Sequence, residues 1–395
     1  MTAPRSILFV TGTRADFGKL EPLARAARDA GHAVSFFVTG MHMLPRYGLT
    51  KLEVQRMQGV GVVEFLNHRE GDPQDVIFAK TVLGFSDHLR VAPPDLVVVH
   101  GDRVEAMATA LVCATNYIRC AHIEGGEVSG TIDEIFRHCN TKLASCHMVS
   151  SEAARARVLA LGETETRVFV IGSPELDTHR AGSGVGLDAV RARYEIGFDD
   201  YGIVIFHPVT SEAAGMRAQA RALFDTLAAS GRHFVVIRPN NDPGAEAIQE
   251  VIAAQPAARF RVLPSMRFAH FSELLRHASA IIGNSSTGVR EAPFLGVPSL
   301  DIGTRQTNRS GAASVHHATA TDRAAIDAFL SVTWGRRYPA STEFGGGTAA
   351  GNFVRILEDD GFWQGPLQKT FNDVTPPGGA GAASEARGTG EAGHG

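Results

Sequence analysis

Two successive series of short, almost wholly apolar runs rich in β-branched residues restrict the fold of this chain more than any other feature. The runs do not alternate between polar and apolar residues, which is typical of strands buried on both faces of a parallel sheet. Stretches with helical spacing of apolar residues, such as 19–30 and 104–115, lie between them. The first series comprises residues 7–10, 34–38, 96–99, 120–123, 147–149 and 168–171, and the second comprises residues 203–206, 234–237, 260–263, 280–282 and 299–302.

This repeated pattern predicts an α/β fold of two Rossmann-like, doubly wound domains that face each other across a cleft. A chain of 395 residues also exceeds the length that one hydrophobic core usually spans. A Gly-rich stretch, residues 180–186, separates the two series and is the expected hinge. We therefore predict an N-terminal domain at 1–178, a C-terminal domain at 179–374 whose final helix packs back on the first domain, and a disordered Gly/Ala/Pro-rich tail at 375–395.

Composition excludes several classes of protein. The formal net charge of −4 provides no basic field of the kind that attracts nucleic acid. No apolar run approaches the roughly 18 residues that cross a bilayer, and no signal peptide is expected at the N-terminus. Cys113, Cys120, Cys139 and Cys146 form no CxxC pair, and the histidines show no metal-ligand spacing. We expect a cytoplasmic protein that uses no metal.

The first strand leads into a turn that could bind phosphate. Glycines in a strand-to-helix turn let backbone amides approach an anion, and Arg14 and Lys19 add positive charge here. The turn is not a P-loop, because Leu20 stands where that motif needs Ser or Thr. Taken alone, the segment is explained equally well as an ordinary turn with solvated charges.

Carboxylates concentrate after two other strands of the first series. Asp102 and Arg103 follow residues 96–99 and form either a structural ion pair or part of the cleft floor. Glu124 and Glu127 flank the Gly-Gly pair that follows residues 120–123. A carboxylate at the end of a buried strand is costly unless it is used or paired, so Glu124 is a candidate for chemistry.

A helix is expected to begin just beyond this turn. Thr131 and Glu134 have the spacing of a capping box, which accounts for Glu134 without any catalytic role. Asp133 and Arg137 lie four residues apart and so share one face of the helix. We predict that Arg137 is the partner of the two candidate catalytic carboxylates, Glu124 and Asp133.

The second series carries polar residues suited to a nucleotide. Small residues at the start of a helix make an anion site, and a carboxylate one turn further on can accept both ribose hydroxyls. A lone His at a strand end is more often structural, and an Asn there can simply make a turn. The residues concerned are His207, Asn240, Ser285, Ser286, Gly288, Glu291 and Arg305.

Seven segments in this order resemble the UDP-N-acetylglucosamine 2-epimerases, and specifically the hydrolysing branch that feeds sialic acid synthesis. The first turn reads Gly-Thr-Arg-Ala-Asp-Phe where the non-hydrolysing branch has Gly-Thr-Arg-Pro-Glu, and the fourth strand reads His-Ile-Glu-Gly-Gly-Glu-Val where that branch has His-Val-Glu-Ala-Gly-Leu-Arg. The similarity continues weakly to about residue 374. The segments are residues 12–20, 100–105, 122–138, 207–210, 239–242, 283–291 and 303–309.

The resemblance implies a glycosyltransferase-B arrangement, a UDP-sugar substrate, no cofactor and a homo-oligomer, dimeric or tetrameric as in relatives. Gly18 stands where some relatives have a nucleotide-contacting Ser, so a contact there would come from backbone. By resemblance, the catalytic set is Asp102, Glu124, Asp133, Arg137 and His207, and the substrate-binding set is Arg14, Lys19, Arg103, His207, Asn240, Ser285, Ser286, Gly288, Glu291 and Arg305.

The expected reaction is elimination of UDP to a glycal followed by hydration to N-acetylmannosamine, with the identity of the base left open among Asp102, Glu124 and Asp133. Three alternatives remain. The substrate could be a UDP- or GDP-2,4-diacetamido sugar of the legionaminic acid route. A glycosyltransferase of the same fold would not need the Glu124 and Asp133 carboxylates. A catalytically silent nucleotide-sugar sensor is the third alternative, from another class.

Overall fold

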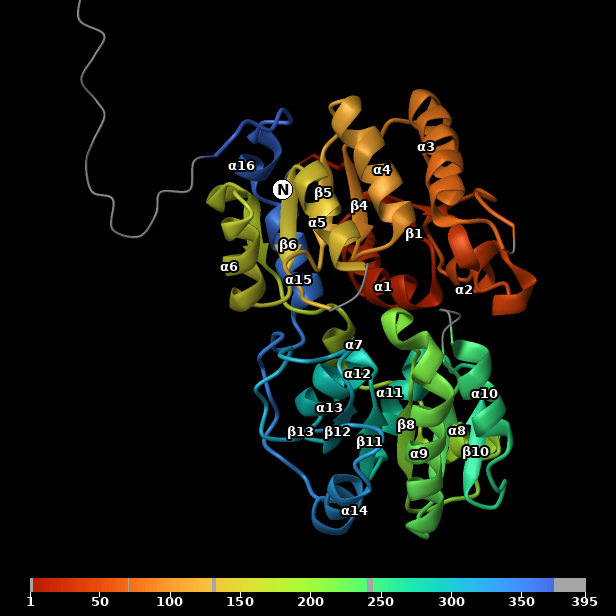
Figure 1. Cartoon of the computed structure of the whole chain (residues 1–395). Helices are drawn as coiled ribbons and strands as arrows, with labels where there is room; N and C mark the ends of the chain where they lie inside the picture. The colour runs from red at the N-terminus through yellow and green to blue at the C-terminus, as the bar shows by residue number, and fades with distance from the viewer. Residues whose placement is uncertain (1–2, 70, 130–132, 240–243, 373–395) are drawn as a thin grey trace, which may run out of the picture.

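The computed structural model describes residues 3–69, 71–129, 133–239 and 244–372, which form two lobes, each built on a parallel sheet (Figure 1). The first sheet has seven strands in the order β3-β2-β1-β4-β5-β6-β7, and the second has six in the order β10-β9-β8-β11-β12-β13. Every strand pairing is parallel. The predicted α/β fold of two doubly wound units is therefore confirmed.

The first lobe contains the first sheet and the helices packed on it. Its strands are β1 (Ser6–Thr11), β2 (Ala33–Val38), β3 (Gly61–Glu64), β4 (Leu96–His100), β5 (Cys120–Ile123), β6 (Cys146–Val149) and β7 (Val168–Val170). Its helices are α1 (Arg14–Asp29), α2 (Lys51–Gln55), α3 (Gln74–Val91), α4 (Val104–Thr115), α5 (Asp133–Leu143), α6 (Glu152–Ala160), α15 (Ala349–Leu357) and α16 (Asp360–Gln364).

The second lobe contains the second sheet and its helices. Its strands are β8 (Gly202–Ile205), β9 (Phe234–Ile237), β10 (Phe260–Leu263), β11 (Ala280–Gly283), β12 (Ser299–Ile302) and β13 (Val315–Ala318). Its helices are α8 (Leu187–Tyr194), α9 (Met216–Ala229), α10 (Ala245–Ala253), α11 (Phe268–His277), α12 (Ser286–Val289), α13 (Glu291–Phe294) and α14 (Arg323–Val332).

All eleven predicted strands are present, and two further strands lie at sheet edges. β3 begins with Gly61 and ends with Glu64, and β13 contains two histidines, so neither has the continuous apolar run of a central strand. An edge strand is covered on fewer sides than a central one and can carry polar residues. The sequence pattern that finds buried strands therefore missed both.

Alternate residues of the central strand β1 explain why both faces of the first sheet are covered. Ile7 and Phe9 belong to the core under α1 and α15, whereas Leu8 and Val10 belong to the core under α3 and α4. Successive side chains of a strand point to opposite faces, so an entirely apolar strand needs a helical layer on each side.

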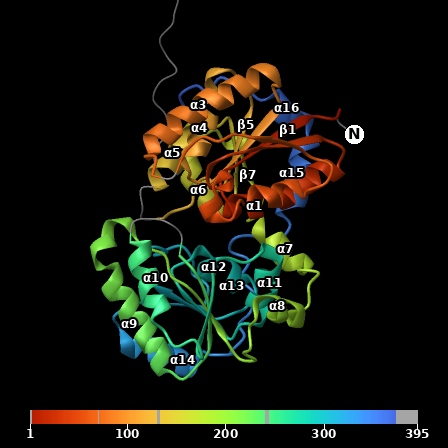
Figure 2. The ribbon, with the colours of Figure 1, turned by 90° about the vertical axis from the view of Figure 1, so that its right-hand side faces the viewer.

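Helix α7 (Glu175–Ala181) lies between the lobes (Figure 2). It contacts α1 and α15 of the first lobe and α11 and α13 of the second. The boundary predicted between residues 178 and 179 falls inside this helix and stays a prediction. The tail predicted at 375–395 lies outside the described residues.

The chain returns to the first lobe at its end. The ring of Phe353 on α15 lies 6.0 Å from that of Phe9, and both side chains are fully buried. The last helices thus complete the apolar layer over one face of the first sheet. Within the ranges described, no helix has the length and hydrophobicity needed to cross a membrane.

We expect Phe353→Ala to lower the free energy of unfolding by about 3–5 kcal/mol, because it opens a cavity in the core of the first lobe. Phe371→Ala is the matched control, since that ring is 91% exposed and its loss should change stability by about 0.5 kcal/mol or less. Urea denaturation of both variants measures the difference. Equal stability of the two would contradict this account of the packing.

Candidate active site

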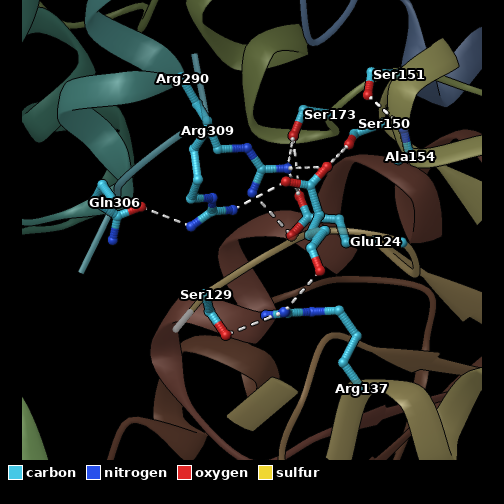
Figure 3. Close-up of polar contacts among 12 residues, drawn as sticks. Glu124, Ser129, Arg137, Ser150, Ser151, Ala154, Ser173, Arg290, Gln306 and Arg309 are labelled. Atoms are coloured by element: carbon cyan, nitrogen blue, oxygen red, sulfur yellow. Dashed lines mark hydrogen bonds and ion pairs between the residues drawn. The ribbon is translucent and has the colours of Figure 1, made fainter. Parts of the chain in front are cut away.

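Glu124 is the centre of a buried ionic cluster between the two lobes (Figure 3). It directly follows β5 and has a φ of 62°, a left-handed conformation that is costly for a side chain other than Gly. Oε2 accepts hydrogen bonds from Lys19 Nζ at 2.8 Å, His100 Nε2 at 3.0 Å and Arg290 Nη1 at 3.0 Å. Oε1 accepts from Arg290 Nη2 at 2.6 Å and Ser173 Oγ at 2.9 Å.

These partners fix the charge state of Glu124. Burial alone would raise the pKa of this carboxyl, but the charges of Arg290, Lys19 and His100 outweigh it and hold the pKa well below its ordinary value. Glu124 is therefore ionised at neutral pH and has a low affinity for a proton.

His100, at the end of β4, is the cation that joins Glu124 to a second carboxylate. Its Nδ1 lies 3.2 Å from Asp16 Oδ1, and its Nε2 lies 3.0 Å from Glu124 Oε2. Burial disfavours the imidazolium, yet Glu124 and Asp16 outweigh that effect and raise the pKa of His100 to about 9. Sequence reasoning did not select His100, because a His at a strand end carries no pattern of its own.

Glu127 forms a second ion pair between the lobes. Arg309 Nη2 lies 3.0 Å from Glu127 Oε2, and Ser150 Oγ donates to the other carboxylate oxygen. The tight turn before Glu127 requires glycine, since Gly126 has a φ of 76° and a Cβ there would lie 2.2 Å from the carbonyl oxygen of Ala154. The Gly-Gly pair thus brings both glutamates to the surface that faces the second lobe.

The contacts of Arg137 differ from those predicted for it. Its ion pair is with Asp102, and its Nη1 donates to the backbone carbonyl of Glu127 at 3.1 Å and to Ser129 Oγ at 3.3 Å. The predicted partnership with Glu124 is wrong, because Arg290 from the other lobe occupies both oxygens of that carboxylate. Asp133 begins α5 and is half-buried, whereas Thr131 lies outside the described residues.

The short helix α12 of the second lobe begins near the ionic cluster around Glu124. Ser285 caps α12, accepting from Thr287 N, while Ser286 is the first residue of the helix and Gly288 is buried within it. Glu291 is buried and accepts from Thr287 Oγ1 at 2.9 Å and His179 Nε2 at 2.8 Å. Burial opposes the ionised form of Glu291, but the hydrogen bond from His179 prevails and lowers the pKa of this carboxyl.

His207 follows β8, and Asn284 fixes its backbone. The His207 N–H donates to Asn284 Oδ1 at 2.7 Å, and Asn284 Nδ2 donates back to the His207 carbonyl at 2.8 Å. Arg305 Nη1 donates to the Asn284 carbonyl at 3.2 Å. Burial, reinforced by the charge of Arg305, lowers the pKa of His207 to about 3, so the ring is neutral. Asn240 lies outside the described residues.

Two of the predicted cations of the first lobe are paired with carboxylates near the interlobe surface. Arg14 Nε donates to Glu53 at 3.0 Å, and Arg14 Nη1 donates to Ser265 Oγ of the second lobe at 2.6 Å. Arg103 Nε donates to the buried Glu105 at 3.3 Å. Neither side chain reaches Glu124, whereas Lys19 does.

Arg290, Arg309 and Ser173 complete the cluster, and sequence reasoning gave them no role. Arg290 directly precedes the predicted Glu291, and Arg309 ends the last of the seven segments. The segments of both arginines were therefore found, but ion pairs between positions more than 100 residues apart cannot be read from spacing. Ser173 lies outside all seven segments. The part of the chain that the structure describes holds no group of His, Cys, Asp and Glu that could bind a metal ion.

Comparison with known proteins identifies the family. The model of the UDP-N-acetylglucosamine 2-epimerase family matches residues 25–358. The chain belongs to this family. It is 39% identical over 374 residues to a UDP-N-acetylglucosamine 2-epimerase of Neisseria meningitidis serogroup B, a match that covers 94% of this chain and 99% of the relative. It is 32% identical to a hydrolysing UDP-N,N'-diacetylbacillosamine 2-epimerase of Legionella pneumophila, over 77% of this chain and 82% of the relative.

Solved structures of the family share the fold. The Neisseria meningitidis UDP-GlcNAc 2-epimerase bound to UDP-GlcNAc superposes with a TM-score of 0.75 at 18% identity, covering 89% of this chain and 99% of that one. The Methanocaldococcus jannaschii enzyme in complex with UDP-GlcNAc and UDP gives 0.74 at 19% identity, with the same coverage. The arrangement of two sheet-based lobes is thus that of the UDP-GlcNAc 2-epimerases.

The charge of His100 makes a pH-dependent contribution to stability. A histidine whose pKa is raised on folding stabilises the protein fully below its unfolded pKa of about 6.5, and this contribution is lost as the pH rises through the folded value. We expect the free energy of unfolding to fall between about pH 6.5 and 9, by ~1.4 kcal/mol for each unit by which the pKa is raised.

His100→Gln should flatten this part of the curve, whereas the exposed His138→Gln should preserve it. Chemical denaturation across this pH range measures both slopes. A wild-type slope in His100→Gln would show that His100 is not the group responsible.

Proposed function

We propose that the chain is a hydrolysing UDP-N-acetylglucosamine 2-epimerase that converts UDP-N-acetylglucosamine and water to N-acetylmannosamine and UDP, and so supplies sialic acid synthesis. The proposal rests on one observation. Carboxylates of the first lobe face arginines of the second lobe across the interlobe surface. Two relatives support the choice of reaction and pathway. One is the hydrolysing epimerase of Legionella pneumophila, and the other, 29% identical, is a polysialic acid biosynthesis protein of Escherichia coli.

The second lobe would hold the nucleotide. The start of α12 at Ser285 and Ser286 offers hydroxyls and backbone N–H groups to the diphosphate, with Arg305 as a nearby cation. The ionised Glu291 would accept hydrogen bonds from the ribose hydroxyls. Neutral His207 would lie beside the nucleotide without adding charge. This orientation turns the sugar toward the carboxylates of the first lobe.

The chemistry begins with the α-linked sugar, in which the C1–O and C2–H bonds are trans-diaxial. A carboxylate takes the C2 proton, the C1–C2 double bond forms, and the electrons of the C1–O bond leave with UDP. Water then adds at C1, and a proton is delivered to C2 from the opposite face, which yields N-acetylmannosamine. The C2 proton is poorly acidic, so stabilisation of departing UDP by fixed cations must contribute much of the rate.

The contacts of Glu124 argue against it as the proton acceptor. A carboxylate that accepts hydrogen bonds from Arg290, Lys19 and His100 is a weak base, and general bases work best when their pKa lies near the operating pH. We assign proton transfer to Asp102 and Asp133 and assign to Glu124 the task of ordering the surrounding cations. Asp102 forms an ion pair with Arg137, and its side chain is 28% exposed.

Proton NMR of the wild-type protein with UDP-N-acetylglucosamine should show free N-acetylmannosamine and UDP. Asp102→Asn and Asp133→Asn should each slow UDP release by about 100- to 10,000-fold, the usual range for losing a general acid–base group. Glu124→Gln should also slow UDP release, because an amide cannot hold the cations that surround Glu124. Glu134→Gln, at a residue predicted only to cap α5, should leave turnover unchanged.

Near-normal turnover in Asp102→Asn or in Asp133→Asn would overturn the assignment of proton transfer to that residue, and near-normal turnover in Glu124→Gln would overturn its role in ordering the cations. A sugar that is inverted at C2 but still linked to UDP would indicate the non-hydrolysing reaction instead.

A 2,4-diacetamido sugar nucleotide is the second candidate substrate. It is favoured by the Legionella pneumophila relative and by a 28% identical GDP/UDP-N,N'-diacetylbacillosamine 2-epimerase of Campylobacter jejuni. The same NMR assay with UDP-N,N'-diacetylbacillosamine separates the candidates. Faster release of UDP from this compound than from UDP-N-acetylglucosamine would reverse the preference.

A further inference from the structure

Arg290 is a second-lobe residue whose guanidinium binds the first lobe and the adjoining residues that lead into α7. It lies at the junction of α12 and α13, and its side chain is only 2% exposed. Besides its two hydrogen bonds to Glu124, it donates to Ser173 Oγ at 2.8 Å. Glu175 and Glu127 lie 3.7 and 4.0 Å from its terminal nitrogens. Figure 3 shows the side chains of Arg290 and Arg309 extending side by side toward the region of Glu124.

The backbone of Arg290 belongs to the proposed nucleotide site. Its N–H donates to the carbonyl of Ser286 at 3.0 Å, and the next residue in the chain is Glu291. The proposed contacts to the diphosphate and the ribose therefore flank Arg290 in one short segment, residues 285–291. A shift of this segment on nucleotide binding would move the guanidinium with it.

The geometry of the Arg290–Glu124 pair indicates that Arg290 fixes the orientation of the Glu124 carboxylate, in addition to neutralising its charge. Two parallel N–H···O bonds fix the plane of the Glu124 carboxylate, which a point charge cannot do. Lys19 and His100 come from the same lobe as Glu124, so their contacts with it do not cross between the lobes. Arg290 reaches Glu124 from the other lobe, so this contact depends on how the lobes are placed.

We propose that Arg290 is a positioning residue that orients Glu124 when the lobes are closed and so couples nucleotide binding on the second lobe to assembly of the carboxylate site on the first. The effect on turnover rests on the proposed function, whereas the effect on lobe closure does not. Arg290 does not contact the reacting atoms in this scheme. It acts through Glu124.

The test compares Arg290→Gln and Arg290→Lys with Arg261→Gln. Arg261 is the control because its ion pair, with Glu195 at 2.7 Å, lies at the edge of the second lobe. Small-angle X-ray scattering with saturating UDP measures closure, and UDP-N-acetylglucosamine turnover gives kcat and KM. Thermal melting of each variant reports whether it is folded.

With UDP bound, we expect the wild type and Arg261→Gln to have the same compact radius of gyration and Arg290→Gln to have a larger one. Arg290→Gln should lower kcat by about 100-fold or more, because Glu124 is no longer oriented. KM should rise by a smaller factor, because the direct contacts to the nucleotide are kept and only the contribution of closure to binding is lost. Arg290→Lys should restore part of kcat, since it returns the charge without the paired hydrogen bonds.

Closure of UDP-bound Arg290→Gln to the wild-type radius would overturn the proposal. So would a loss confined to KM, or a kcat of Arg290→Lys equal to that of Arg290→Gln when both variants are folded. A wild-type protein that closes on UDP but does not turn over UDP-N-acetylglucosamine would overturn the proposed function alone, because the scattering comparison would still test the coupling.

Discussion

The buried ion pair between Glu124 and Arg290 is the interaction on which the arrangement of the site depends. Removing a carboxylate and a guanidinium from water is costly, and the cost is offset only when good geometry and further hydrogen bonds satisfy both groups. Here Lys19 and His100 donate to Glu124, and Ser173 bonds to both groups. Because the two charges come from different lobes, separation of the lobes would break this pair and expose both groups to water. The same residues therefore form both the candidate site and the contact between the lobes.

The fold brings these groups together through the ends of parallel strands. His100 ends β4, and Glu124 directly follows the neighbouring β5, so both lie at the carboxyl edge of the first sheet. The second sheet presents its own carboxyl edge, where α12 and Arg305 follow β11 and β12. Crevices at such edges are where open α/β sheets bind ligands. The two edges face each other, so one ligand can contact both.

Patterns within one segment could be predicted from sequence, whereas contacts between segments could not. Continuous apolar runs revealed every central strand, and the cost of an unpaired carboxylate after a buried strand singled out Glu124. The edge strands β3 and β13 lack that apolar signal and were missed. The helix face shared by Asp133 and Arg137 leads to the prediction that Arg137 is the partner of Glu124 and Asp133, yet Arg137 forms an ion pair with Asp102. Arg290 lies 166 residues from Glu124, and only the closed fold brings them together.

We propose that carboxylates at the interlobe surface carry out proton chemistry at C2 of a UDP-linked sugar and that UDP is lost by elimination. Reaction of UDP-N-acetylglucosamine in D2O, with early quenching and mass spectrometry of the released sugar, tests it most directly. The account predicts N-acetylmannosamine with one deuterium, located at C2. A released sugar with hydrogen still at C2 would contradict elimination and the roles given to these residues.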